Sequence, residues 1–200
     1  MPCDVVVVGA SAGGVKALET LVRHLPATLR AAVCVVLHVP AWRKSALPEI
    51  LARAGTLPAA HAVDRELLKP GRVYVAPPDL HMLINVGRIE LWHGPRENLH
   101  RPAINPLFRS AATAYGDRAA GVVLSGAQDD GAAGLWWIKK YGGTTMAQDP
   151  FEAEHPSMPQ SAIEAVSVDH VAPVAELARL LTWLAAGVRT VNPRSTKGWS

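Results

Sequence analysis

The sequence predicts a doubly wound α/β fold, a Rossmann-like three-layer sandwich with a mostly parallel sheet and one antiparallel β-hairpin. Three observations support this prediction: strand and helix patterns alternate along the chain, several strands are apolar throughout, and glycine-rich or polar turns follow them. Strands that are apolar at every position are typical of parallel sheets, because helices cover both of their faces.

The first half of the chain shows the alternation clearly. Residues 5–8 form an uninterrupted valine strand, and apolar residues then recur with helical spacing until Pro26 ends the helix. Three further elements are expected: a buried strand over 33–37, a short helix over 47–54, and a strand over 71–76 that Pro77 and Pro78 stop.

The second half begins with a predicted hairpin, whose strands over 81–85 and 88–92 are joined by Val86 and Gly87. Asn105 is expected to cap a helix that begins at Pro106 and ends before Gly116. The remaining predicted elements are strands over 119–124, 144–147 and 169–172 and helices over 132–141 and 173–186.

Length and composition indicate one domain. Two hundred residues, 49% of them hydrophobic, are enough for one well-buried core and short for two. We expect this domain to cover residues 1–186. Residues 187–200 are polar and without periodicity, so we expect a flexible C-terminal tail or linker there.

Charge and cysteine content exclude several classes of partner. The net charge is only +3 and lysine and arginine form no long run, so no nucleic-acid partner is expected. No apolar stretch approaches the roughly 20 residues that span a bilayer, and no signal peptide is evident, so we expect a cytoplasmic protein without membrane insertion. The two cysteines fit a reducing compartment. The histidines show no tight ligand spacing, so no metal or other cofactor is expected.

A candidate nucleophile follows the first strand. Residues 9–13 read Gly-Ala-Ser-Ala-Gly and match the nucleophile-elbow pattern, in which Ser11 would stand on a tight turn before a helix N-terminus. The same turn is nearly a Rossmann phosphate-binding turn, which makes a nucleotide-binding protein an alternative. A dinucleotide site expects an acidic residue at the end of the second strand, and His38 stands there instead, so the nucleotide alternative is the weaker one.

Two more polar residues follow apolar strands. His38 ends the second strand, and Asp129 and Asp130 follow the strand over 119–124. Because the carboxyl ends of parallel strands converge on one crevice, a serine, a histidine and an acid are expected to meet there, as in a serine hydrolase. Either aspartate could orient the histidine, and either could instead cap the helix that begins near Ala132. The chain order Ser, His, Asp differs from that of the α/β-hydrolases.

Several segments resemble the catalytic domain of the chemotaxis protein-glutamate methylesterase CheB, over about residues 4–185. The matching segments are Gly-Ala-Ser-x-Gly-Gly (9–14), His-x-Pro (38–40), Arg-Pro-x-x-x-Pro-Leu-Phe-Arg-Ser-Ala-Ala (101–112), Gly-x-x-x-Asp-Gly-Ala-Ala-Gly (126–134), and a segment near 157–163.

The resemblance implies hydrolysis of γ-glutamyl methyl esters on chemoreceptor helices, with release of methanol, and deamidation of receptor glutamines. It implies Ser11 as nucleophile, His38 as general base and Asp130 as the acid that orients this base. A catalytically dormant module that docks on receptors is the non-enzymatic alternative.

The chain departs from the family's pattern beside the catalytic residues. Ala12 stands where the family commonly has Thr, and Ala127 and Gln128 replace Met-Gly, so Ala12 and Ala127 are candidate substrate-binding positions.

Basic residues near the predicted site, and the domain arrangement of the family, lead to expectations about the substrate and about regulation. Arg43, Lys44, Arg96 and Arg101 are candidate cations for steering an acidic receptor segment, and Arg43 and Arg101 are the ones we select. The family's N-terminal phosphoreceiver domain has no counterpart in this sequence, so a receiver acting in trans is a possible regulator.

Overall fold

A seven-stranded parallel sheet forms the central layer of the structure, a computed structural model that describes residues 2–188. The strand order is β3-β4-β2-β1-β7-β8-β9, and every neighbouring pair is parallel. The predicted doubly wound sheet is therefore confirmed. The strands are β1 (Val5–Ala10), β2 (Ala32–Leu37), β3 (Ala59–His61), β4 (Val73–Val75), β7 (Ala119–Val123), β8 (Thr144–Gln148) and β9 (His170–Ala172).

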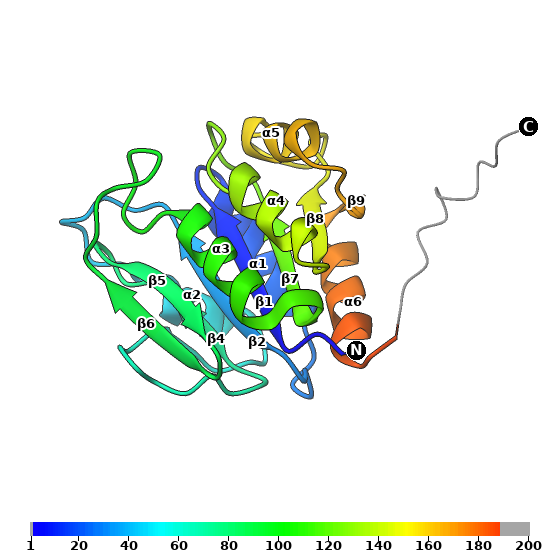
Figure 1. Ribbon diagram of the computed structural model, residues 1–200, viewed down its shortest axis with the longest axis horizontal. Helices are drawn as coiled ribbons and strands as arrows, with labels where there is room; N and C mark the ends of the chain where they lie inside the picture. The colour runs from blue at the N-terminus through cyan, green and yellow to red at the C-terminus, as the bar shows by residue number, and fades with distance from the viewer. Residues whose placement is uncertain (1, 189–200) are drawn as a thin grey trace, which may run out of the picture.

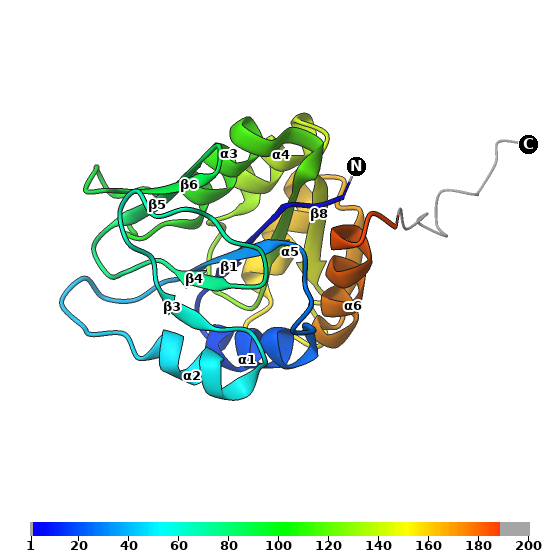
Figure 2. The same ribbon diagram turned by 90° about the horizontal axis from the view of Figure 1, so that it is seen from below.

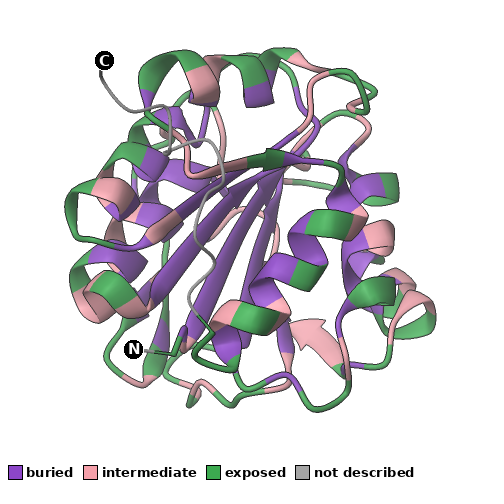
Figure 3. Cartoon of the chain, turned by 90° about the vertical axis from the view of Figure 1, so that its right-hand side faces the viewer, coloured by how far each residue is buried: buried purple, intermediate pink, exposed green. Residues whose placement is uncertain are grey.

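Helices cover both faces of this sheet, as the edge-on view in Figure 2 shows. Alternate side chains of β1 point to opposite layers: Val6 and Val8 belong to one hydrophobic cluster, Val5 and Val7 to the other. The central strands β1 and β2 are fully buried between the two layers (Figure 3), whereas the edge strands β3 and β9 are only partly buried. One layer holds α1 (Gly14–His24), α2 (Leu47–Ala54) and α6 (Val174–Ala185), and the other holds α3 (Ile104–Tyr115), α4 (Ala132–Lys140) and α5 (Ser157–Ala165).

The antiparallel hairpin of β5 (His81–Asn85) and β6 (Arg88–Trp92) lies outside the main sheet, beside α3 (Figure 1). Met82 and Ile89 share the hydrophobic cluster of α3. The predicted bounds of both strands are confirmed. None of the helices in the described part of the chain is long and apolar enough to cross a membrane.

β1 lies at the centre of the sheet, where the order of the strands reverses. From β1 the chain passes to β2 on one side, and β7 joins β1 on the other. Ligand sites of open α/β sheets lie beyond the carboxyl ends of the strands at such a point. The loops after β1, β2 and β7 therefore meet at the site described below.

The structure differs from the sequence-based expectations in three places. The N-cap of α3 is Ala103, so the prediction that Asn105 caps this helix is wrong: Asn105 lies in the first turn and its side chain bonds elsewhere. β3 was not predicted, because none of its residues, Ala59, Ala60 and His61, belongs to the types favoured in strands. α5 was not predicted either, although Pro159 is tolerated in its first turn. Of the expected tail over 187–200, residues 189–200 lie outside the described residues.

Candidate active site

Ser11 stands in the turn between β1 and α1. Its N–H donates a hydrogen bond of 3.0 Å to the carbonyl of Ser125, and its own carbonyl accepts one of 2.9 Å from Gly14 N. Gly13 adopts a left-handed φ of 70°, which allows the strand to turn directly into the helix. The side chain is thus held at the carboxyl edge of the central strand, ahead of the N-terminus of α1.

Gly126, the residue after Ser125, packs directly against this turn. A Cβ atom at Gly126 would lie 2.9 Å from Ser11 Cβ and 2.5 Å from Met158 Sδ. Real Cβ atoms do not approach other atoms so closely, so only glycine fits without displacing the candidate nucleophile. The loop after β7, which also contacts Met158 of α5, therefore packs closely against Ser11.

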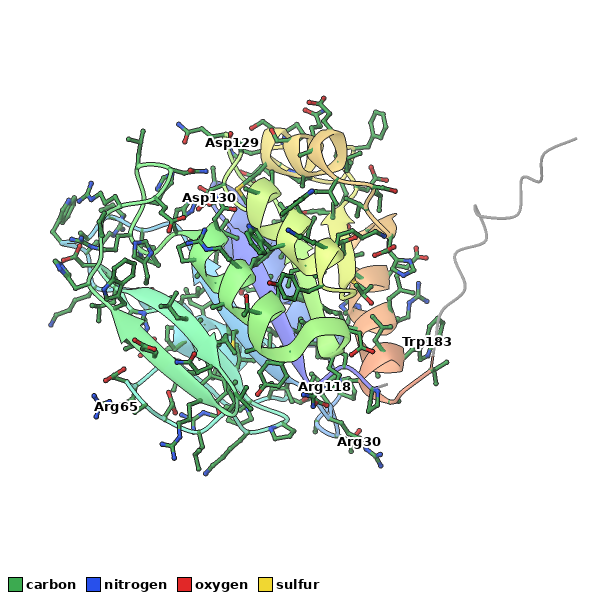
Figure 4. The ribbon with its side chains drawn as sticks, in the orientation of Figure 1. Arg30, Arg65, Arg118, Asp129, Asp130 and Trp183 are labelled. Carbon is green, nitrogen blue, oxygen red and sulfur yellow. The ribbon has the colours of Figure 1, made fainter. Side chains whose placement is uncertain are left out.

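His38 and Asp130 form a buried pair beside Ser11. His38 Nε2 lies 2.8 Å from Asp130 Oδ2, and the two side chains are only 5% and 1% exposed. An ionised carboxylate accepts hydrogen bonds and does not donate them, so Nε2 carries the proton and Nδ1 is left with its lone pair. Asp129 is exposed, and Figure 4 shows both aspartates at the same edge of the molecule. The structure thus places Asp130, and not Asp129, against the histidine.

The first turn of α3 holds the Asp130 carboxylate. The N–H of Ile104 donates to Oδ2 at 2.7 Å, and the N–H of Asn105 donates to Oδ1 at 3.1 Å. The N-terminus of a helix carries a partial positive charge and unpaired N–H groups, both of which stabilise a carboxylate. Asp130 therefore caps α3, not the helix that follows it in the sequence, whose N-cap is Gly131.

Asn105 joins α3 to α4 beside this carboxylate. Its Oδ1 accepts hydrogen bonds from Gly131 N at 3.1 Å and from Gly134 N at 2.7 Å. The side chain is nearly fully buried. The sequence predicts a helix cap at Asn105 but carries no local sign of this link, because the partners of the side chain lie 26 and 29 residues away.

The second nitrogen of His38 is buried without a partner. Nδ1 has no hydrogen bond within the described residues. Ser11 and His38 both line a cavity of about 340 Å³. A buried polar atom without a partner carries a free-energy cost, so it is a candidate for a functional role. A histidine nitrogen with a free lone pair in the same cavity as a serine is suited to take the serine's proton.

His100 packs on one face of the His38 ring. The two ring centroids are 3.6 Å apart and the planes differ by 8°. Burial, and next the nearby charge of His38, lower the pKa of His100, whereas its hydrogen bond with the side chain of Gln128 raises it. Gln128 has a left-handed φ of 69°, a conformation that suits the glycine of the family pattern. His100 was not among the predicted site residues, although it directly precedes the Arg-Pro segment at residues 101–102.

The four predicted substrate-binding residues lie on loops around this site. Ala12 and Ala127 are exposed in the turns after β1 and β7, and Arg43 is exposed in the loop after β2. Arg101 lines the cavity, but its guanidinium binds Asp79 at 2.7 Å and the Gly94 carbonyl at 2.7 Å.

Arg101 and Asp79 form a structural pair. The hydrogen bonds from Arg101 hold the pKa of Asp79 below its usual value. The positive charge of Arg101 is thus already matched by a carboxylate, whereas Arg43 has no carboxylate partner among residues 2–188.

A serine, a histidine and an aspartate gathered at the carboxyl edge of a doubly wound α/β sheet define a serine hydrolase. The chain belongs to the CheB methylesterase family, whose model matches residues 6–181. A crystal structure of the CheB methylesterase catalytic domain from Thermotoga maritima superimposes with a TM-score of 0.87 at 32% identity, and the match covers 92% of this chain and all of the other.

Two kinds of relative share this domain. A Leptospira interrogans protein, named provisionally as a protein-glutamate methylesterase/protein-glutamine glutaminase, is 40% identical over 90% of this chain and 94% of its own length. A protein-glutamate methylesterase/protein-glutamine glutaminase of Anaeromyxobacter dehalogenans is also 40% identical, over 89% of this chain, but the match covers only 52% of its length. The chain therefore spans nearly all of the first relative and about half of the second.

Proposed function

We propose that this protein removes methyl esters from the γ-carboxyls of glutamates in chemoreceptor-like proteins and releases methanol. The observation that carries the proposal is the buried His38–Asp130 pair, whose free Nδ1 belongs to a histidine lining the same cavity as Ser11. The names of the relatives support the same reaction, and they also support deamidation of receptor glutamines at the same site, with ammonia as the leaving group.

The first half of the reaction forms an acyl-enzyme. Ser11 Oγ attacks the ester carbonyl as His38 Nδ1 takes its proton, and the carbonyl oxygen becomes an oxyanion. Asp130 stays ionised and stabilises the imidazolium through Nε2–H. Collapse of the intermediate breaks the bond to the methoxy oxygen, which takes the proton from Nδ1 and leaves as methanol.

The second half repeats these steps with water. Nδ1 of His38 removes a proton from the attacking water, and the second intermediate collapses with cleavage of its bond to Ser11 Oγ. The proton returns to Oγ, and the product is the glutamate γ-carboxylic acid, which releases its proton to solvent and becomes a carboxylate. One histidine thus serves as base and then as acid in each half.

Two exposed turns are suited to stabilise the oxyanion. We propose the N–H groups of Ala12 and Ala127 for this role, since neither has a hydrogen-bond acceptor within the described residues and both follow strands that end at the site. Ala12 also stands at the N-terminal end of α1, where the helix dipole favours negative charge. Because backbone groups would do this work, the missing hydroxyl at Ala12 and the missing thioether at Ala127 need not abolish activity.

Substrate recognition, cellular location and regulation are also parts of this proposal. We propose that Arg43 steers glutamate-rich receptor helices toward the site and that Arg101 shapes the cavity. The reaction would take place in the cytoplasm, where the signalling helices of chemoreceptors lie. A receiver domain in trans remains our candidate regulator.

Substitutions at the three residues test the reaction. Ser11→Ala, His38→Ala and Asp130→Asn should each lower kcat for methanol release from methylated receptor by about 10³-fold or more. The double variant Ser11→Ala/His38→Ala should be hardly worse than either single one, because the residues act as a unit. Asp129→Asn is the matched control for Asp130→Asn and should be mild. A larger loss for Asp129→Asn would contradict the assignment.

A dormant receptor-binding module predicts a different result. Such a module would bind methylated receptor but would release no methanol, and Ser11 would not react with a fluorophosphonate probe. We expect labelling of Ser11 in the native protein and none in Ser11→Ala or in protein unfolded by denaturant.

A further inference from the structure

Two large apolar side chains stand exposed on loops beside the catalytic cavity. Trp42, in the loop after β2, is 85% exposed, and Leu99, which lines the cavity, is 77% exposed. Trp42 lines a second hollow of about 390 Å³, and the two hollows share Ala41. An apolar side chain left in water forfeits its hydrophobic stabilisation, so two of them at one mouth suggest a surface that is covered by a partner.

The exposed Leu99 side chain is carried by a strained, left-handed backbone conformation. Glu97 and His100 exchange hydrogen bonds of 3.2 and 2.8 Å, and between them Asn98 and Leu99 have φ values of 48° and 68°. Tight turns with two positive φ values favour Asn followed by Gly, because a side chain at the second position is crowded. Leu99 occupies this position and gains little packing in return. Strain of this kind is concentrated at functional sites.

Positive charge surrounds the same mouth. Arg43 and Lys44 line the hollow of Trp42, and Arg96 lines the cavity beside Leu99. None of the three has a carboxylate partner within the described residues. Three of the nearby acids are already paired: Asp79 with Arg101, Glu97 with Arg109, and Asp130 with His38.

We propose that Trp42 and Leu99 grip apolar side chains of an acidic helical segment, whose carboxylates meet Arg43, Lys44 and Arg96. The occupant is thus an amphipathic, negatively charged protein segment that presents its ester to Ser11. The proposal rests on the proposed function and adds to it the residues that select a protein substrate over a small ester. Charge complementarity favours this occupant, since three unpaired cations would repel a basic segment and gain nothing from a neutral one.

Selectivity between two substrates tests the proposal. For Trp42→Ala and Leu99→Ala, the ratio of kcat/KM for a methylated, glutamate-rich amphipathic peptide to kcat/KM for methyl acetate should fall about tenfold, mostly through KM of the peptide. Trp183→Ala is the matched control: this tryptophan is half exposed on α6, away from the site (Figure 4), and its ratio should stay unchanged. If this ratio of kcat/KM values is unchanged in both Trp42→Ala and Leu99→Ala, the proposal is wrong.

Leu99→Gly separates recognition from folding. Glycine relieves the left-handed strain, so we expect the Tm to rise by about 2–4 °C while the peptide's KM rises as in Leu99→Ala. A merely structural role of Leu99 predicts no such divergence.

Binding to the Ser11→Ala variant keeps this proposal distinguishable from the proposed function. When Trp42→Ala or Leu99→Ala is added to Ser11→Ala, the Kd for the same methylated peptide should rise about tenfold, whether or not the native protein releases methanol. If both double variants bind the peptide as tightly as Ser11→Ala does, the proposed role of Trp42 and Leu99 is wrong. If the peptide binds but the native protein releases no methanol, only the proposed reaction is wrong.

Discussion

His38 is fixed by contacts on two sides. Asp130 holds Nε2 at 2.8 Å, and His100 covers one face of the ring at a centroid distance of 3.6 Å. The first contact selects the tautomer with a free Nδ1, and the second restricts rotation of the ring. The imidazole is therefore preorganised before substrate binds, which lowers the entropy cost of the proton transfer.

At the residue scale, His100 predicts a pH dependence of stability. Burial and the neighbouring His38 lower its pKa below the usual histidine value of 6.5, so the folded protein binds a proton at His100 less readily than the unfolded chain does. Stability from this residue is therefore present above about pH 6.5 and is lost as the pH falls toward the lowered pKa. Denaturant unfolding between about pH 7.5 and 5 should show a smaller loss of the free energy of unfolding in His100→Phe.

The comparison needs a second histidine as a control. Burial also lowers the pKa of His170, so part of the pH dependence should persist in His100→Phe and should shrink further when His170→Phe is added. An identical pH dependence in the native protein and in His100→Phe would contradict this account.

At the scale of elements, the active site depends on how the N-termini of α3 and α4 meet. The side chain of Asp130, in the loop before α4, accepts hydrogen bonds from two N–H groups of α3. The side chain of Asn105, in α3, accepts hydrogen bonds from two N–H groups at the start of α4. This reciprocal arrangement satisfies donors that neither helix can satisfy itself. It also sets the position of Asp130 relative to His38.

Removal of the Asn105 side chain should therefore affect both stability and catalysis. Asn105→Ala leaves two buried N–H groups unpaired and should lower the free energy of unfolding by about 1–3 kcal/mol. It should also lower kcat more than it raises KM, because the Asp130 loop loses its anchor. Denaturant unfolding and steady-state kinetics of methyl ester hydrolysis measure the two effects.

Asn85→Ala provides the matched control. Asn85 lies exposed at the end of β5, where its amide donates to Glu90, so its removal should cost little stability and leave kcat unchanged. If Asn105→Ala behaves like Asn85→Ala, the link between the two helices does not support the site.

At the scale of the whole molecule, the layered fold isolates its cysteines. Cys3 precedes β1 and Cys34 lies within β2, and both are free and buried. Burial raises the pKa of Cys3 to about 12, and burial raises the pKa of Cys34 further. Because the thiolate is the reactive form, neither thiol should react in the folded protein.

Thiol titration with a disulfide reagent tests this prediction. At about pH 8, just below the ordinary thiol pKa, the native protein should react only as fast as it unfolds, and both thiols should react at once in denaturant. The raised pKa values also mean that stability from the two buried thiols is present below the ordinary thiol pKa of 9.0 and is lost as the pH rises from there toward the raised values. Rapid labelling of a folded sample would show that one of the outer layers opens independently.

Much of the fold could be predicted from local patterns. The bounds of the hairpin strands and of α2 agree with the sequence-based expectation, because alternation, helical periodicity, Pro and Gly mark them within a few residues. β3 carries a weaker local signal, because Ala59, Ala60 and His61 are not residue types that favour strands. α5 has two serines and a proline among its nine residues, which weakens its helical pattern. Tertiary contacts stabilise both elements: β3 pairs with β4, and Met158 at the start of α5 donates a hydrogen bond to the Gly126 carbonyl.

The sequence by itself determined the alternating elements, the family resemblance, and the presence of a serine, a histidine and two acids after apolar strands. Only the tertiary structure decided which aspartate meets His38, which imidazole nitrogen stays free, and that His100 and Asn105 belong to the site. The physical reason is that these contacts join residues far apart in the chain, 92 positions in the case of His38 and Asp130, where no local pattern records the partner.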